Sequence, residues 1–175
     1  SYSNYASRLI GTQLIVYSPL RFSYGQDDVL NVLPGISRWT EGQQEPAFRR
    51  IARSQDVHIP RVLQRAGAEK VEMMHVVYRC DLASPELDCG ATVVLGGRSS
   101  FFFVSHNAAY LWNEIPREVG EFSFVYRFGH DGAPVTAARV WESPWDQFGF
   151  HANMAAGRLD LLMISRSSTP QWGDQ

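Results

Sequence analysis

The sequence predicts an all-β fold with antiparallel sheets, on three observations. Short runs of apolar, β-branched and aromatic residues recur roughly every ten residues along the chain. Turn-forming Gly, Pro, Asn, Asp and Ser residues lie between the runs, as in an antiparallel sandwich, barrel or propeller rather than in βαβ units. Several runs are apolar at consecutive positions, for example residues 93–95 and 161–163, so we expect these strands to be covered on both faces, as in stacked sheets.

The first expected strand is residues 13–17 (QLIVY), which follow Gly11 and precede a Ser-Pro turn signal. Turns at His106-Asn107 and at residues 130–132 (HDG) separate the aromatic-rich runs further along the chain. The other expected strands are residues 73–78, 91–95, 101–105, 109–112, 122–128, 135–141, 148–150 and 159–164.

Residues 22–70 interrupt this rhythm, because they are polar, rich in proline and without a sustained strand pattern. We expect an insertion between two strands, with more loop than strand and less core than residues 71–164. Two short helices are predicted within it, over residues 46–52 and 60–66. The second begins with a proline and ends before Gly67, which are typical boundary residues.

Four consecutive expected strands over residues 100–142 match the ~40–45 residues of a four-stranded propeller blade. An earlier unit combines the strands on either side of the insertion, and a last unit starts at residue 148 and stops after two strands. The sequence thus predicts antiparallel four-stranded blades of a β-propeller, about two and a half in this chain, whereas closure needs ~4–8. Because an open stack exposes an apolar face, we expect partners: the remaining blades or a second copy of the chain. The polar residues 165–175 are expected to form a frayed tail.

Several phrases of the sequence occur in the order found in one known family. The chain resembles the β-propeller domain of secreted and membrane-anchored prokaryotic proteins over about residues 7–164, departing from it at Asp146, where the family often has Asn, and in the proline-rich insertion. The resemblance implies a propeller fold and an extracytoplasmic compartment, and it carries over no catalytic residue. The phrases are residues 7–14 (SRLIGTQL), 77–82 (VYRCDL), 94–96 (VLG), 103–111 (FVSHNAAYL), 125–128 (VYRF), 131–132 (DG), 146–150 (DQFGF) and 157–159 (GRL).

The two cysteines, Cys80 and Cys89, flank a Ser84-Pro85 turn signal. If the flanking segments pair as a hairpin, the cysteines become cross-strand neighbours within reach of a disulfide. Two buried free thiols are the alternative. We predict the bond, and with it an oxidising compartment, so that the protein is secreted, cell-surface or periplasmic.

Composition excludes some classes of function. Sixteen basic and eighteen acidic side chains give a net charge of -2, which argues against nucleic-acid binding, since phosphate backbones select basic faces. No apolar run approaches the ~20 residues of a membrane span. The first residues, SYSNYASRLI, do not have the pattern of a signal peptide, which could have been removed or lie upstream.

Candidate site residues are few, and each has a structural alternative. Asp146 and Gln147 precede an expected strand, where a carboxylate could bind a ligand but more often caps a turn. His106 lies in a turn and His151 just past a strand, both candidates for a loop or funnel site. Neither has a second His or Cys at ligand spacing, and the same holds for His58, His75 and His130, so we expect no metal.

Two further patterns are weaker. Asp27-Asp28 and Asp56 lack the spacing of a calcium loop. The run Phe101-Phe102-Phe103 could line a sugar platform, although packing between blades is the commoner use of such residues. We therefore expect no cofactor.

The sequence favours a non-catalytic extracytoplasmic module for binding or scaffolding, with an unknown protein or carbohydrate ligand. One alternative is a propeller-based hydrolase or lyase whose active residues lie on blades absent from this chain. A third is an ADP-ribosyltransferase, since residues 77–79 (VYR) and 98–100 (RSS) are similar to the arginine and serine strands of those enzymes. That family also needs a late Gln/Glu-x-Glu, and the one match in spacing, Gln43-Gln44-Glu45, lies upstream of both.

Overall fold

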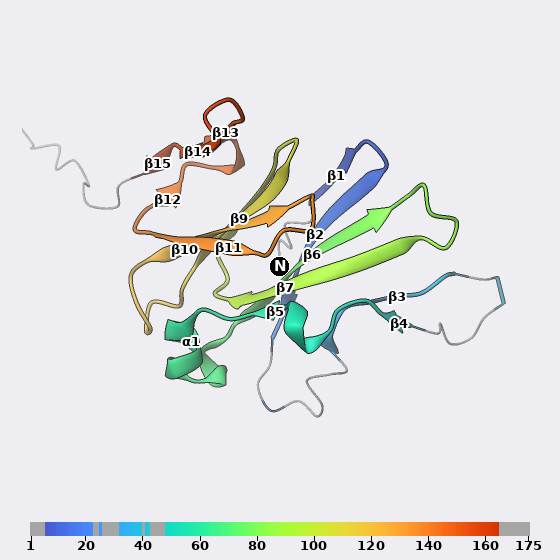
Figure 1. Cartoon of the computed structure of the whole chain (residues 1–175). Helices are drawn as coiled ribbons and strands as arrows, with labels where there is room; N and C mark the ends of the chain where they lie inside the picture. Colours follow the sequence, from blue (N-terminus) through green and yellow to red (C-terminus); the bar gives the residue numbers. More distant parts are fainter. Residues whose placement is uncertain (1–5, 23–24, 26–31, 40, 43–47, 165–175) are drawn as a thin grey trace, which may run out of the picture. The chain divides into compact units, whose positions relative to one another are not determined.

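The structure is a computed structural model that describes residues 6–22, 25, 32–39, 41–42 and 48–164. It consists of two compact units, which we call the N-terminal unit (Ser1–Arg98) and the C-terminal unit (Ser99–Gln175). Both are built on antiparallel sheets, which confirms the predicted all-β class (Figure 1). The predicted blades and their closure into a propeller remain a proposal. Among the described residues no helix has the length and hydropathy to cross a bilayer.

The N-terminal unit contains a five-stranded sheet in the order β1-β2-β6-β7-β5. Its first four strands form an antiparallel meander, and β5 is parallel to β7. Gly11, with φ of 59°, allows the tight turn between the first two strands. The strands are β1 (Ala6–Ile10), β2 (Gln13–Arg21), β5 (Val57–His58), β6 (Met73–Asp81) and β7 (Asp88–Gly96).

The insertion lies where the sequence predicts it, because β2 and β6 on either side of it pair along their whole length. Its described part has short elements joined by loops, with more loop than strand. Helix α1 starts after Pro60 and ends at Gly67, whose φ of 110° stops the helix, as predicted. The described elements of the insertion, besides β5, are β3 (Gly35–Ile36), β4 (Arg49–Arg50), η2 (Ser54–Asp56), α1 (Arg61–Ala66) and η3 (Ala68–Lys70).

The prediction of a helix over residues 46–52 is wrong for residues 48–52, which the structure describes. Arg49 and Arg50 are extended and pair with β3. The next residue, Ile51, donates its N–H to the Pro34 carbonyl and accepts a hydrogen bond from the Ala91 N–H of β7. These long-range backbone bonds prevail over the local helix propensity of the segment.

One face of the N-terminal sheet is covered by the insertion. Ala52 is fully buried against Met74, Val76 and Val93, and Val57 packs on the same cluster. Ala52 and Leu63 are the buried hydrophobic side chains of the insertion's described part, so it contributes less core than residues 71–164, as predicted.

The C-terminal unit is centred on a four-stranded antiparallel meander, in the order β11-β10-β9-β8. These are the four strands predicted for residues 100–142. A hairpin of β13 and β14 packs on one face, where Phe150 meets Tyr110, Trp112 and Val125. The strands are β8 (Ser100–Val104), β9 (Ala108–Glu114), β10 (Ser123–Gly129), β11 (Thr136–Val140), β13 (Phe150–Asn153) and β14 (Arg158–Leu161).

The last predicted strands differ in detail. Residues 147–149 form a 3-10 turn, η4 (Gln147–Gly149), and the strand predicted over 159–164 is interrupted at Leu162. The Leu162 N–H donates to the Gly149 carbonyl at 2.7 Å, and the Leu162 carbonyl accepts from the Trp145 N–H. A Cβ on Gly149 would lie 2.9 Å from the Leu162 oxygen, so this approach needs glycine. The break separates β14 from β15 (Met163–Ile164), which pairs with β12 (Ser143–Pro144).

Cys80 and Cys89 form the predicted disulfide. They are directly opposite each other in the β6–β7 hairpin, with their Cα atoms 4.1 Å apart. Both side chains are largely buried, and the bond closes a short loop that contains the Ser84-Pro85 turn.

Replacing both cysteines, Cys80→Ala with Cys89→Ala, should lower the free energy of unfolding by about 2–3 kcal/mol, because the short cross-linked loop restricts the unfolded chain only moderately. Urea denaturation measures the difference. In parallel, thiol titration of the denatured, unreduced wild type should find no reactive thiol; detection of both would contradict the bond.

Candidate functional site

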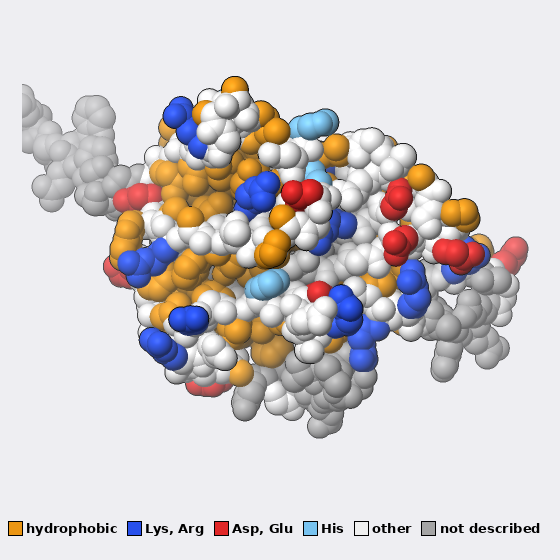
Figure 2. Space-filling model, in the orientation of Figure 1, with side chains coloured by type: hydrophobic (Ala, Val, Ile, Leu, Met, Phe, Trp, Pro, Cys, Tyr) orange, Lys and Arg blue, Asp and Glu red, His pale blue; other side chains and the backbone are white. Residues whose placement is uncertain are grey.

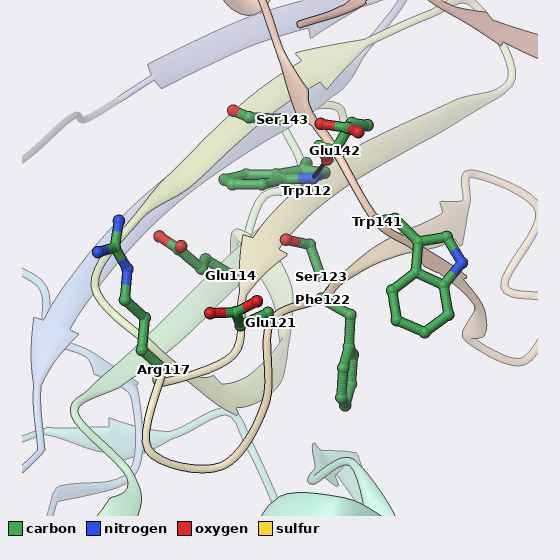
Figure 3. A pocket seen from close by; sticks show the side chains of 9 residues that line it. All are labelled: Trp112, Glu114, Arg117, Glu121, Phe122, Ser123, Trp141, Glu142 and Ser143. Carbon is green, nitrogen blue, oxygen red and sulfur yellow. Dashed lines mark hydrogen bonds between the residues drawn. The ribbon is translucent and has the colours of Figure 1, made fainter. Parts of the chain in front are cut away.

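A pocket opens at one end of the four-stranded sheet of the C-terminal unit (Figure 3). Its cavity volume is about 390 Å³, within the range of small-molecule sites. The lining side chains come from the end of β9, the β9–β10 loop, the start of β10 and the segment after β11. They are Trp112, Glu114, Arg117, Glu121, Phe122, Ser123, Trp141, Glu142 and Ser143.

The antiparallel meander explains why these segments meet. In such a sheet the end of β9, the start of β10 and the end of β11 lie at the same end of the sheet. Ser123 is accordingly paired with both Glu114 and Val140. The β9–β10 loop is anchored by Ile115, which is fully buried and donates its N–H to the Phe122 carbonyl. The pocket is thus supported by sheet residues and one compact loop.

Aromatic rings line the pocket from both faces of the sheet. Trp112 lies on the face of Ser123 and Val140, and Phe122 and Trp141, which we call the aromatic wall, lie on the other. Trp112 is 1% exposed, and its indole N–H donates to the Glu142 carbonyl at 3.1 Å, which fixes the ring. Trp141 is 65% exposed and meets Phe122 edge-on, with ring centroids 6.0 Å apart. The guanidinium carbon of Arg139 lies 4.5 Å from the Trp141 centroid and 5.3 Å from that of Phe122.

Hydrogen-bond acceptors predominate among the polar groups of the pocket. Glu114, Glu121 and Glu142 contribute carboxylates, and Arg117 is the one cationic side chain among the lining residues. Ser123 is only 4% exposed, and Figure 3 shows its hydroxyl directed into the pocket; the described residues provide it no hydrogen-bond partner.

The candidates predicted from sequence lie outside this lining. Asp146 accepts a hydrogen bond from the Phe148 N–H at 2.7 Å and caps η4, in line with its structural interpretation. Gln147, His106 and His151 are exposed on η4, on the β8–β9 turn and on β13. Within the described residues no hydrogen bond joins any two of these four side chains, and they do not form one site.

His75 has a structural place in the N-terminal unit. Its ring is fully buried, its Nε2–H donates to the Gly97 carbonyl at 2.8 Å, and its Nδ1 accepts from the Tyr17 hydroxyl at 2.7 Å. The carbonyl cannot donate, so it requires the proton on Nε2 and leaves Nδ1 as acceptor. Burial lowers the pKa of His75 to about 4, and the Gly97 hydrogen bond opposes this only in part.

The remaining histidines do not assemble a metal centre. Partial burial lowers the pKa of His58, although Asp56 nearby acts in the opposite direction. The Nε2–H of His130 donates to the Ser105 carbonyl, 3.1 Å away. Over the residues that the structure describes, no group of three or more His, Cys, Asp or Glu side chains is placed to hold a metal ion. Asp27-Asp28 and Gln43–Glu45 lie outside these residues, so the transferase hypothesis stays a hypothesis.

No protein-family model, curated protein or solved structure matches this chain. The resemblance to propeller domains therefore remains an expectation, and the function is argued from the pocket itself.

Sequence reasoning missed the pocket residues because they follow no spacing motif. The sequence signal that could have identified them is the order of the predicted strands. The acidic loop between two predicted strands, residues 114–121, and the residues after the next strand, 141–143, share one end of an antiparallel meander.

Two buried tyrosines provide a matched test of hydrogen bonding. Tyr17→Phe leaves His75 Nδ1 without its donor and should cost about 1–3 kcal/mol of unfolding free energy. The hydroxyl of Tyr126 is buried without a hydrogen-bond partner among the described residues, and burial raises its pKa. Tyr126→Phe should therefore leave the unfolding free energy unchanged or raise it. Urea denaturation compares the variants, and equal losses would contradict this assignment.

Stability should fall in acid because of His75. Its pKa is about 4 when folded and 6.5 ordinarily, so between these values the unfolded chain binds a proton that the folded chain does not. The unfolding free energy should decrease by about 3 kcal/mol as the pH falls from near 7 to about 4. Urea denaturation across this range measures the slope. His75→Gln should flatten it, and an unchanged slope in that variant would assign the pH dependence to other groups.

Proposed function

We propose that the chain is a non-catalytic extracytoplasmic binding module whose ligand enters the pocket at the end of the C-terminal sheet. The observation that carries the proposal is the combination of a concave site, aromatic walls and inward-directed polar groups in one place.

The construction of the pocket supports binding. Trp112 is held by packing, with its ring centroid 5.6 Å from that of Phe101, and by its hydrogen bond to the Glu142 carbonyl. A site carried by strand ends and a compact loop keeps its shape before the ligand arrives, which reduces the entropy lost on binding.

The disulfide supports the proposed compartment. A bond between Cys80 and Cys89 is compatible with an extracytoplasmic location, because cytosolic proteins rarely retain structural disulfides.

Exposed apolar side chains support a scaffolding role with further blades or a second copy of the chain. Figure 2 shows hydrophobic side chains gathered over part of the C-terminal unit. Those that the unit exposes most include Trp145, Phe148 and Leu162, at 66%, 81% and 67%. Apolar exposure of this kind is typical of interaction surfaces. The four-stranded meanders of the two units are the sheets that such blades would extend.

Binding in the pocket should shift the indole N–H signal of Trp141 in ¹⁵N-resolved NMR spectra. The test titrates the protein with neutral disaccharides, acidic sugars, amino acids and alkylamines. Trp145 is the internal control, because it is as exposed as Trp141 but does not line the pocket. Trp141→Ala should weaken binding at least severalfold, and Trp145→Ala should leave it unchanged.

A panel in which no compound shifts Trp141, or in which Trp145→Ala weakens binding as much as Trp141→Ala, would contradict the proposed site. New product signals during the titration, lost in the Glu121→Gln variant, would contradict the non-catalytic assignment and favour a hydrolase or lyase.

A further inference from the structure

The polar groups of the pocket define the ligand that it can satisfy. Carboxylates accept hydrogen bonds and never donate when ionised, and the pocket has three of them. Two of the donors are engaged within the protein: the Trp112 N–H is bonded to the Glu142 carbonyl, and the Ser143 hydroxyl donates to the Pro144 carbonyl. A complementary ligand is therefore rich in donors.

The net negative charge of the lining side chains favours a positively charged ligand. Glu114, Glu121 and Glu142 outnumber the cationic Arg117, and they still outnumber the cations when Arg139 behind the aromatic wall is included. A cation entering the pocket lowers the repulsion among the carboxylates, whereas an anion raises it.

The aromatic wall already binds a cation. Arg139 stacks its guanidinium over Trp141 and Phe122, at distances where the negative face of the ring attracts a positive charge. Both rings also line the pocket.

Ser123 adds an observation independent of charge. It is almost completely buried, its hydroxyl points into the pocket, and it has no hydrogen-bond partner among the described residues. Because the hydroxyl faces the open pocket, it offers an acceptor to which a ligand N–H can donate.

We infer that the pocket takes an organic cation: an ammonium or guanidinium group on an aliphatic chain, as in a lysine or arginine side chain or a free alkylamine. The inference rests on the proposed function and specifies its ligand. The charged group lies between the carboxylates and the Ser123 hydroxyl.

The test titrates the whole chain with butylamine, agmatine and the blocked amides of lysine and arginine, and with 1-butanol and a neutral disaccharide as uncharged probes. The cations should shift the Trp141 indole signal, and their affinity should fall as salt rises, because ionic strength screens the carboxylates. If the blocked amides bind at least as tightly as the free amines, the source is a peptide side chain; if only the free amines bind, it is a small molecule.

Glu121→Gln should weaken cation binding about fivefold, the effect of one partly exposed charge pair. Glu118→Gln is the matched control, since it removes the same charge from the same loop outside the pocket lining. Ser123→Ala should also weaken binding, without changing its salt dependence.

Binding of the disaccharide without the cations would overturn this inference and leave the proposed function intact. Equal effects of Glu121→Gln and Glu118→Gln, or cation binding that is independent of salt, would also overturn it. If no probe of any class shifts Trp141, the proposed function fails as well.

Discussion

The antiparallel pairing of β2 with β6 joins two strands that the insertion separates in the sequence. Its register determines which side chains face each side of the N-terminal sheet, because a shift of one residue would exchange the two faces. With the observed register, Tyr17 lies two positions along from the residue opposite His75, and their side chains meet in a buried hydrogen bond. The same pairing makes the insertion leave and re-enter at one end of the sheet, from where Ala52 reaches the core.

In the C-terminal unit, by contrast, the strands that pair in the central sheet are neighbours in the sequence. Its meander connects sequence neighbours through short turns, so that its contacts are local and its strands need no distant segment to set their register. The pocket belongs to this local part. Its acidic side chains come from the end of β9, from the β9–β10 loop and from the residues that follow β11. They are positioned by Trp112 and Ile115, which are buried in the unit. The proposed binding site is thereby carried by the sheet whose contacts are the more local.

What the sequence could predict follows this division between local and distant contacts. The aromatic-rich strands of residues 100–142 and the disulfide were predictable, since adjacent runs and one turn specify them. The segment at Arg49-Arg50 was not, because its extended conformation depends on backbone partners at Pro34 and Ala91. Asp146 could be assigned to a cap from its place before a turn. Glu114, Glu121 and Glu142 could not be assigned to one pocket, because no spacing rule links them and only the shared end of the meander brings them together.

The short strand β5 has a consequence for solubility. β7 is the last strand of the meander and would otherwise present its backbone groups along an open edge, where another chain could add a strand. β5 pairs with Val93 and Val94, and Ile51 accepts the hydrogen bond of Ala91, so the insertion occupies the middle of this edge with its own backbone. A segment that is irregular in sequence thus protects the sheet against edge-to-edge aggregation. Its length can vary among related chains only as far as these few backbone contacts on β7 are kept.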